Sequence, residues 1–141
     1  MELGTFGAIM KFALETEKEV TGFYESAKVL AKSEDLTSQF SNLAIRGQKR
    51  AKTIERIRRE NVTEMILEPI TGLDSDTFTP VTTIPESPDD KALQGIAVEI
   101  ENNLNAFYSQ TAVKVEFLSE VAYAFELLAE ANEEASQSLS S

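Results

Sequence analysis

The sequence predicts an all-α fold: a four-helix bundle in which a long crossover joins the second helix to the third. Two observations predict it. All four prolines of the 141-residue chain fall between residues 69 and 88, and both flanks are rich in Ala, Glu, Leu and Lys, which favour helices. In both flanks apolar residues also recur every three or four positions, as the packed face of a bundle helix requires. The length suits a single domain over residues 1–141.

The first flank, residues 5–60, is expected to form a helical hairpin. Ser33 is a suitable N-cap for its second helix, and Glu34 and Asp35 would then lie in the first turn, where the helix dipole favours negative charge. We call the row of residues that recurs every three or four positions and faces the core the seam of a helix. The expected seam of the first helix is Phe6, Met10, Ala13, Glu17, Val20, Tyr24 and Ala27. That of the second is Leu36, Phe40, Leu43, Gly47, Arg50, Ile54 and Ile57.

The second flank, residues 87–135, is expected to form another hairpin. Ser87 would cap its first helix, Pro88 would occupy the first helical position, and a break near residues 111–115 would separate the two helices. We expect the last seam to stop at Ala129 and residues 136–141 to fray, because the next seam position is the polar Asn132. The two seams are Ala97, Glu101, Leu104 and Tyr108, then Val115, Leu118, Ala122, Phe125 and Ala129.

The middle segment, residues 61–86, is expected to be the crossover. It is much longer than the roughly 2–8 residues that join neighbouring antiparallel helices, so it can run the length of a bundle. Its start, residues 64–67, could extend the second helix. Its apolar stretches, residues 65–67 and 78–81, could cover a second copy, and a homodimer is therefore a possible assembly.

The composition limits the chemistry that this chain can perform. It contains no Cys, His or Trp, which excludes thiolate metal sites, thiol catalysis and histidine as ligand or base. The formal charge of −11 disfavours nucleic acid and anionic membranes as partners, because both require positive surface. No signal peptide or membrane-spanning stretch is visible, so the expected location is the cytoplasm.

The two hairpins contain an internal repeat. Residues 15–24 align with residues 99–108 at a constant offset of 84, with the shared pattern E-x-E-x-x-(V/L)-x-(G/A)-F-Y. In each copy a seam glutamate, Glu17 or Glu101, lies seven residues before a seam tyrosine, Tyr24 or Tyr108.

With its expected crossover, this repeat resembles the ferritin-like superfamily, and within it the rubrerythrin-type branch. The resemblance implies that one Glu from each of the first and third helices joins a Glu-x-x-His pair from each of the others, and that these side chains hold two iron or manganese ions. It further implies peroxide or oxygen chemistry, ferroxidase activity or iron handling. Glu17 and Glu101 match the single glutamates, and Tyr24 and Tyr108 match tyrosines that pack beside them.

The resemblance also implies that four of six ligands are replaced. On the second helix, where Phe40, Leu43 and Ala44 match the family pattern, Gly47 stands for Glu and Arg50 for His. On the fourth helix, Ala122 stands for Glu and Phe125 for His.

These replacements suggest that an Arg–carboxylate cluster takes the place of a metal centre. Arg50 would supply positive charge to Glu17 and Glu101, which would otherwise repel each other. Gly47 would give the Arg50 side chain room, and Ala122 and Phe125 would form ordinary apolar packing. The alternatives are that the glutamates face outward, that Arg50 extends its charge to solvent, and that both tyrosines serve packing alone.

Three functions therefore compete. The favoured one is a non-catalytic ferritin-like protein without a cofactor, which has a structural or partner-binding role. The second is a rubrerythrin-type metal-binding oxidoreductase or iron-handling protein, in which Glu17 and Glu101 would hold iron or manganese. The third is a bundle that accepts a small ligand near Arg50, in space left by Gly47 and Ala122.

Overall fold

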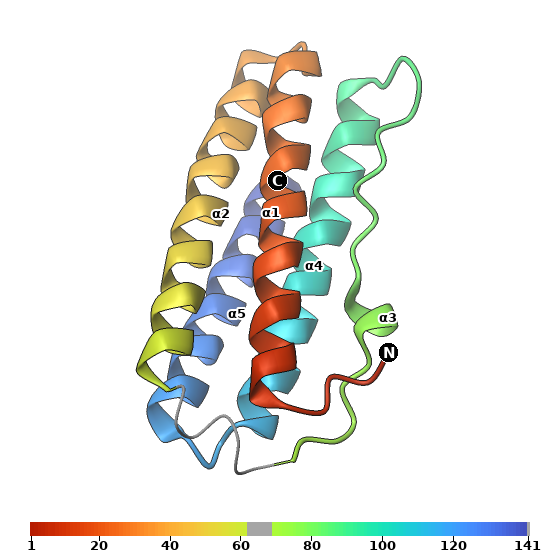
Figure 1. Ribbon diagram of the computed structural model, residues 1–141. Coiled ribbons are helices and arrows are strands. Elements are labelled where there is room, and N and C mark those ends of the chain that lie inside the picture. The colour runs from red at the N-terminus through yellow and green to blue at the C-terminus, as the bar shows by residue number, and fades with distance from the viewer. Residues whose placement is uncertain (62–68, 141) are drawn as a thin grey trace.

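The computed structural model describes residues 1–61 and 69–140, and in these residues four long helices lie side by side (Figure 1). They are α1 (Phe6–Leu30), α2 (Glu34–Glu60), α4 (Asp90–Lys114) and α5 (Ser119–Ser140), and the short α3 (Ser75–Phe78) lies in the crossover. This part of the chain contains no β-strand and only one isolated bridge, between Glu2 and Asp74. The all-α prediction is confirmed. The suggested extension of α2 over residues 64–67 lies outside the described residues.

Two antiparallel hairpins, α1–α2 and α4–α5, build the bundle, with α1 beside α4 and α2 beside α5 (Figure 1). The cap expected at Ser33 is confirmed, since its hydroxyl accepts the Leu36 N–H at 3.1 Å. The Asp90 carboxylate, in the first turn of α4, accepts the N–H groups of Lys32 and Ser33 at 2.8 Å each. These bonds tie the α1–α2 turn to the start of α4.

Two expected helix boundaries were misplaced. Asp89, not Ser87, caps α4, because the Asp89 side chain accepts the Ala92 N–H at 2.8 Å while Ser87 turns the chain with a left-handed φ of 51°. Thr111 remains inside α4, and the break falls at residues 115–118 instead of 111–115. β-branched residues cost a helix only a few tenths of a kcal/mol, about 0.7 at most, so buried packing outweighs them.

The apolar seam of α5 does not stop at Ala129, and residues 136–140 do not fray. Asn132, Ala135, Ser136 and Leu139 are buried, and α5 continues to Ser140. The buried polar groups are compensated across the hairpin: the Ser136 hydroxyl donates to the Asn102 side chain at 2.6 Å, and the Gln94 amide bonds the Leu139 carbonyl.

The crossover covers the α1–α4 side of the bundle (Figure 1). The Leu3 N–H donates to the Leu73 carbonyl at 2.8 Å, and the Phe78 ring packs 5.5 Å from that of Phe107 on α4. Of the two apolar stretches expected to cover a second copy, residues 65–67 lie outside the described part. In the other, Phe78 is buried within its own chain, whereas Val81 is 73% exposed. No described helix has the length and apolar content needed to cross a membrane.

Candidate functional site: a buried Arg–carboxylate cluster

Each long helix places one polar side chain at the same level of the core. These residues are Glu17 on α1, Arg50 on α2, Glu101 on α4 and Asn132 on α5. Arg50 is 5% exposed and the other three are fully buried, so neither glutamate faces outward and Arg50 does not reach solvent. Three of the four occupy the seam positions where polar residues stand out in the sequence.

The Arg50 guanidinium joins the two hairpins. Its Nε lies 3.0 Å from both Glu17 Oε1 and Glu17 Oε2, and its Nη2 lies 3.9 Å from Glu101 Oε2. The Asn132 amide donates to Glu101 Oε1 at 3.0 Å. In the described residues, neither Nη atom of Arg50 nor Oδ1 of Asn132 finds a protein hydrogen-bond partner.

The two tyrosines of the internal repeat donate crosswise. The Tyr108 hydroxyl donates to Glu17 Oε1 at 2.6 Å, and the Tyr24 hydroxyl donates to Glu101 Oε2 at 2.7 Å. Each tyrosine thus bonds the glutamate of the other hairpin, although the E-x6-Y pattern pairs the two residues within one helix. Both rings are fully buried, so these hydroxyls satisfy carboxylate oxygens that have no access to water.

The pKa values of the cluster residues are set by two opposing effects, burial of each group and the charges of its neighbours. Burial raises the pKa of Glu17, while the Arg50 charge and the hydrogen bonds from Tyr108 and Arg50 act in the other direction without cancelling it. Burial lowers the pKa of Arg50, but the charges of Glu17 and Glu101 outweigh it and the net shift is upward. The pKa values of Tyr24 and Tyr108 are raised well above the usual value, first by burial and then by the neighbouring carboxylates. Both tyrosines are therefore neutral hydrogen-bond donors at physiological pH.

A side chain at position 47 would meet α1. A Cβ at this position would lie 2.5 Å from Thr21 Oγ1 and 3.7 Å from Glu17 Oε2. The missing side chain therefore allows α2 to approach α1 closely, and this approach holds Arg50 against Glu17. A glycine inside a helix costs about 1 kcal/mol relative to alanine.

On α5 the two residues expected near the cluster, Ala122 and Phe125, lie in apolar packing. Ala122 is buried, and the Phe125 ring stacks on Tyr108 at 5.8 Å. The α5 side chain that contacts a cluster glutamate is Asn132, seven residues after Phe125. Sequence reasoning missed Asn132, although it shares the signal of the other three: a polar residue at an apolar seam position.

The cluster does not fit a di-metal centre. In residues 1–61 and 69–140, no three Asp, Glu, His or Cys side chains come together as metal ligands would. The two carboxylates already accept hydrogen bonds from Arg50, Asn132 and both tyrosines. In addition, the fixed positive charge of Arg50 opposes a second cation.

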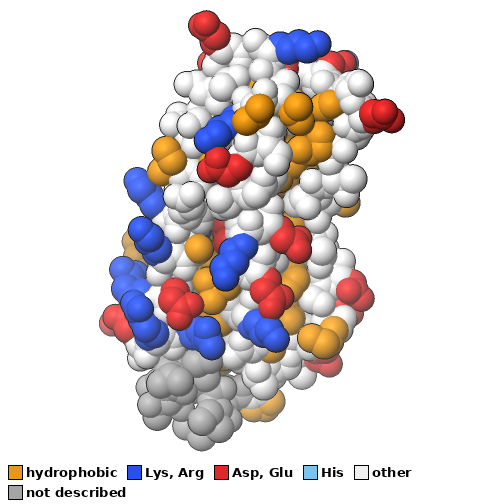
Figure 2. Space-filling model, turned by 45° about the horizontal axis from the view of Figure 1, so that its top comes forward, with side chains coloured by type: hydrophobic (Ala, Val, Ile, Leu, Met, Phe, Trp, Pro, Cys, Tyr) orange, Lys and Arg blue, Asp and Glu red, His pale blue; other side chains and the backbone are white. Residues whose placement is uncertain are grey.

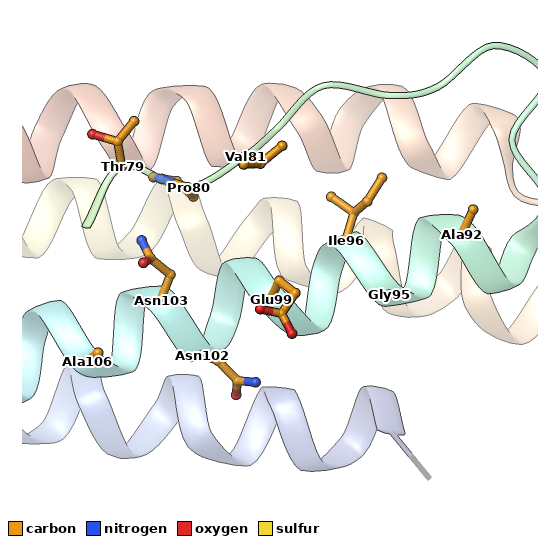
Figure 3. A pocket seen from close by; sticks show the side chains of 10 residues that line it. All are labelled: Thr79, Pro80, Val81, Ala92, Gly95, Ile96, Glu99, Asn102, Asn103 and Ala106. Carbon is orange, nitrogen blue, oxygen red and sulfur yellow. The ribbon is translucent and has the colours of Figure 1, made fainter. Parts of the chain in front are cut away.

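A groove of about 700 Å³ lies between the crossover and α4, and Ile96 and Asn103 project into it (Figure 3). It contains no cluster residue. A hollow of about 190 Å³ between α2 and α5 is lined by Arg46, Lys49, Arg50, Thr53, Leu128 and Ala131. Arg50 borders this hollow, but both of its Nη atoms are buried.

Comparison with known proteins yields no family model, no curated protein and no solved structure that matches this chain.

Proposed function

We propose that this chain is a rubrerythrin-related, ferritin-like bundle in which an Arg–carboxylate cluster stands in place of the di-metal centre. On this proposal the protein is not an enzyme and needs no cofactor, and the bundle has a structural or partner-binding role. The observation that carries the proposal is the 3.0 Å contact of Arg50 Nε with both oxygens of Glu17. A cation that shares this carboxylate with the guanidinium would be repelled by it.

The ligand count supports the same proposal. A di-metal bundle of this type uses six side chains at one level of the core. The corresponding residues here are Glu17, Gly47, Arg50, Glu101, Ala129 and Asn132. Only the two glutamates are ligands that iron or manganese would accept, because Arg has no lone pair to donate and a neutral Asn oxygen is a weak ligand.

Metal analysis of protein purified without chelators tests the proposal. We expect no stoichiometric iron or manganese, and no rise in Tm when Fe²⁺ or Mn²⁺ is added anaerobically, because only a ligand that binds the folded state stabilises it. About two equivalents of either metal per chain, the content of an intact site, would overturn the proposal in favour of a metal-binding oxidoreductase.

A restored ligand set tests the assigned positions. The variant carries Gly47→Glu, Arg50→His, Ala129→Glu and Asn132→His, together with Thr21→Ala to relieve the 2.5 Å contact at Gly47. We expect it to bind iron or manganese.

The matched control keeps the same changes on α1 and α2 but places the α5 pair at the earlier level, as Ala122→Glu and Phe125→His. Because Phe125 lies about two helical turns before Asn132, the α5 residue that bonds Glu101, this control should not bind metal stoichiometrically. If a folded restored variant also fails to bind metal, the ferritin-like assignment of these positions is wrong.

A further inference from the structure

The two hairpins differ strongly in charge. Eleven of the thirteen Lys and Arg residues lie in residues 1–60, and α5 carries five glutamates with no Lys or Arg. In Figure 2 the Lys and Arg side chains gather over the lower part of α2, on the left of the view. The α2–α5 side of the bundle combines the basic helix α2 with the acidic helix α5. It lies opposite the side that the crossover covers (Figure 1).

The outer stripe of α2 is basic. Asn42, Arg46, Lys49 and Thr53 line two hollows that open between α2 and α5, and the same three- and four-residue spacing continues to the exposed Arg56. In the described residues no ion pair joins α2 to α5, and the Arg56 contact is with Glu60 of its own helix at 3.6 Å. Arg46 Nη2 donates to the Ala131 carbonyl of α5 at 3.5 Å, but in the described residues no carboxylate of α5 pairs with the positive charges of this stripe.

The facing stripe of α5 is acidic with an apolar centre. Ala131 and Ser138 line the same two hollows, and the spacing places Glu120, Leu127 and Glu134 on the same side of the helix. Both glutamates are exposed, and Leu127 is 46% exposed. This stripe complements that of α2 in charge, with an apolar residue between the two acids.

We propose that the α2–α5 side is the interface of a homodimer. A two-fold axis parallel to the helices sets α2 of each copy against α5 of the other, so the basic stripe meets the acidic stripe twice in one closed interface. Such an axis keeps residues at their own level. Lys49 and Ala131 line one hollow and therefore lie at about the same height along the bundle. The partner's Glu134 is three residues from the partner's Ala131, so it lies within about one helical turn of the height of Lys49. By the same count, Arg56 lies within about two turns of the partner's Glu120.

The area is sufficient for a stable pair. α5 has 22 residues, which span about 33 Å at about 1.5 Å per residue, and two adjacent helices are about 18–20 Å wide. The side therefore offers roughly 600 Å² per copy, close to the roughly 800 Å² per partner of a standard interface. Leu127 and the half-exposed Ile45 of α2 add apolar area among the charges.

In the proposed partner-binding role, the partner would be a second copy of the chain, and in that respect the dimer rests on the proposed function. The two can still fail separately, because metal content tests the cluster whereas oligomeric state tests the α2–α5 side.

Sedimentation equilibrium of the full chain measures the assembly. We expect a dimer of twice the 15.6 kDa chain mass that dissociates in a single step on dilution. Lys49→Glu with Arg56→Glu should weaken the dimer by at least about 100-fold, because like charges would then face each other in both halves of the interface. Glu120→Lys with Glu134→Lys should do the same.

Mixing the two reversed variants is the decisive arm. Each stripe then meets an opposite charge again, so a one-to-one heterodimer should form although neither variant dimerises alone. The control is Lys11→Glu with Lys18→Glu on α1, which makes the same change in net charge at exposed positions away from this side and should leave the dimer intact. Circular dichroism establishes that every variant is folded.

A monomeric wild-type chain would overturn the proposal, as would open-ended growth with concentration or a dimer that survives both charge reversals.

Discussion

Replacing Arg50 by Met removes the only cation of the cluster while nearly preserving side-chain volume. Two fully buried carboxylates then remain with hydrogen-bond donors but no positive charge. Removing one partner of a buried ion pair typically costs about 3–5 kcal/mol. A domain of this size has a total stability of about 5–15 kcal/mol, so the variant should fold but unfold far more easily.

Urea unfolding followed by circular dichroism at a fixed protein concentration measures this cost. With an m-value of about 2 kcal/mol per molar, the midpoint should fall by about 1.5–2.5 M. Arg58→Met is the matched control on the same helix. Arg58 is half exposed and 3.7 Å from Glu55, and such surface pairs contribute about 0–1 kcal/mol.

The penalty should also depend on pH. Without Arg50 the pKa of Glu17 rises further, because the charge that opposed desolvation is gone. The folded variant then binds protons that the unfolded chain releases, so its stability falls as pH increases above the ordinary range of Glu. The cost should be larger at pH 8 than at pH 5, and it should shrink in a Glu17→Gln, Glu101→Gln background. A loss below about 1 kcal/mol that does not change with pH would refute the argument.

Three further predictions concern the neighbours of Arg50. Tyr24→Phe should cost about 1–3 kcal/mol in chemical denaturation, because it leaves the buried Glu101 Oε2 without its donor, and Tyr108→Phe should cost less, because Glu17 Oε1 still accepts from Arg50; a loss within error for both would mean that the hydroxyls are dispensable. Gly47→Ala should destabilise despite the better helix propensity of Ala, and Thr21→Ala should restore most of the loss in a double-mutant cycle, since the added Cβ meets Thr21 Oγ1 at 2.5 Å. Burial raises the pKa of Glu17, so between the ordinary and the raised value the folded state binds more protons and stability falls as pH rises. Glu17→Gln removes this contribution, and parallel stability–pH curves for the variant and the wild type would contradict the assigned direction.

Local sequence patterns were sufficient for the helices and for most of the cluster. The Ser33 cap, the proline-rich middle and the apolar seams predict the elements, because capping and helix periodicity act over a few residues. The same periodicity marks Glu17, Arg50 and Glu101 as polar residues on an apolar face. Burial of a charge is costly, so three of them at seam positions indicate that they compensate one another.

Relations along and between helix axes required the tertiary structure. Residues seven apart share a helix face, so the pattern could not distinguish the level of Phe125 from that of Asn132, the residue that bonds Glu101. The full length of α5 likewise depends on contacts with α4, the other helix of its hairpin.

The sequence by itself determined an all-helical chain with polar residues on its packed faces, because those signals are encoded within single helices. Only the tertiary structure decided that each tyrosine bonds the glutamate of the other hairpin, that a side chain at position 47 would meet Thr21, and that Asn132 bonds Glu101. The physical reason is that a helix fixes the direction of its side chains but not its height against a neighbour, which is set by packing of the whole bundle.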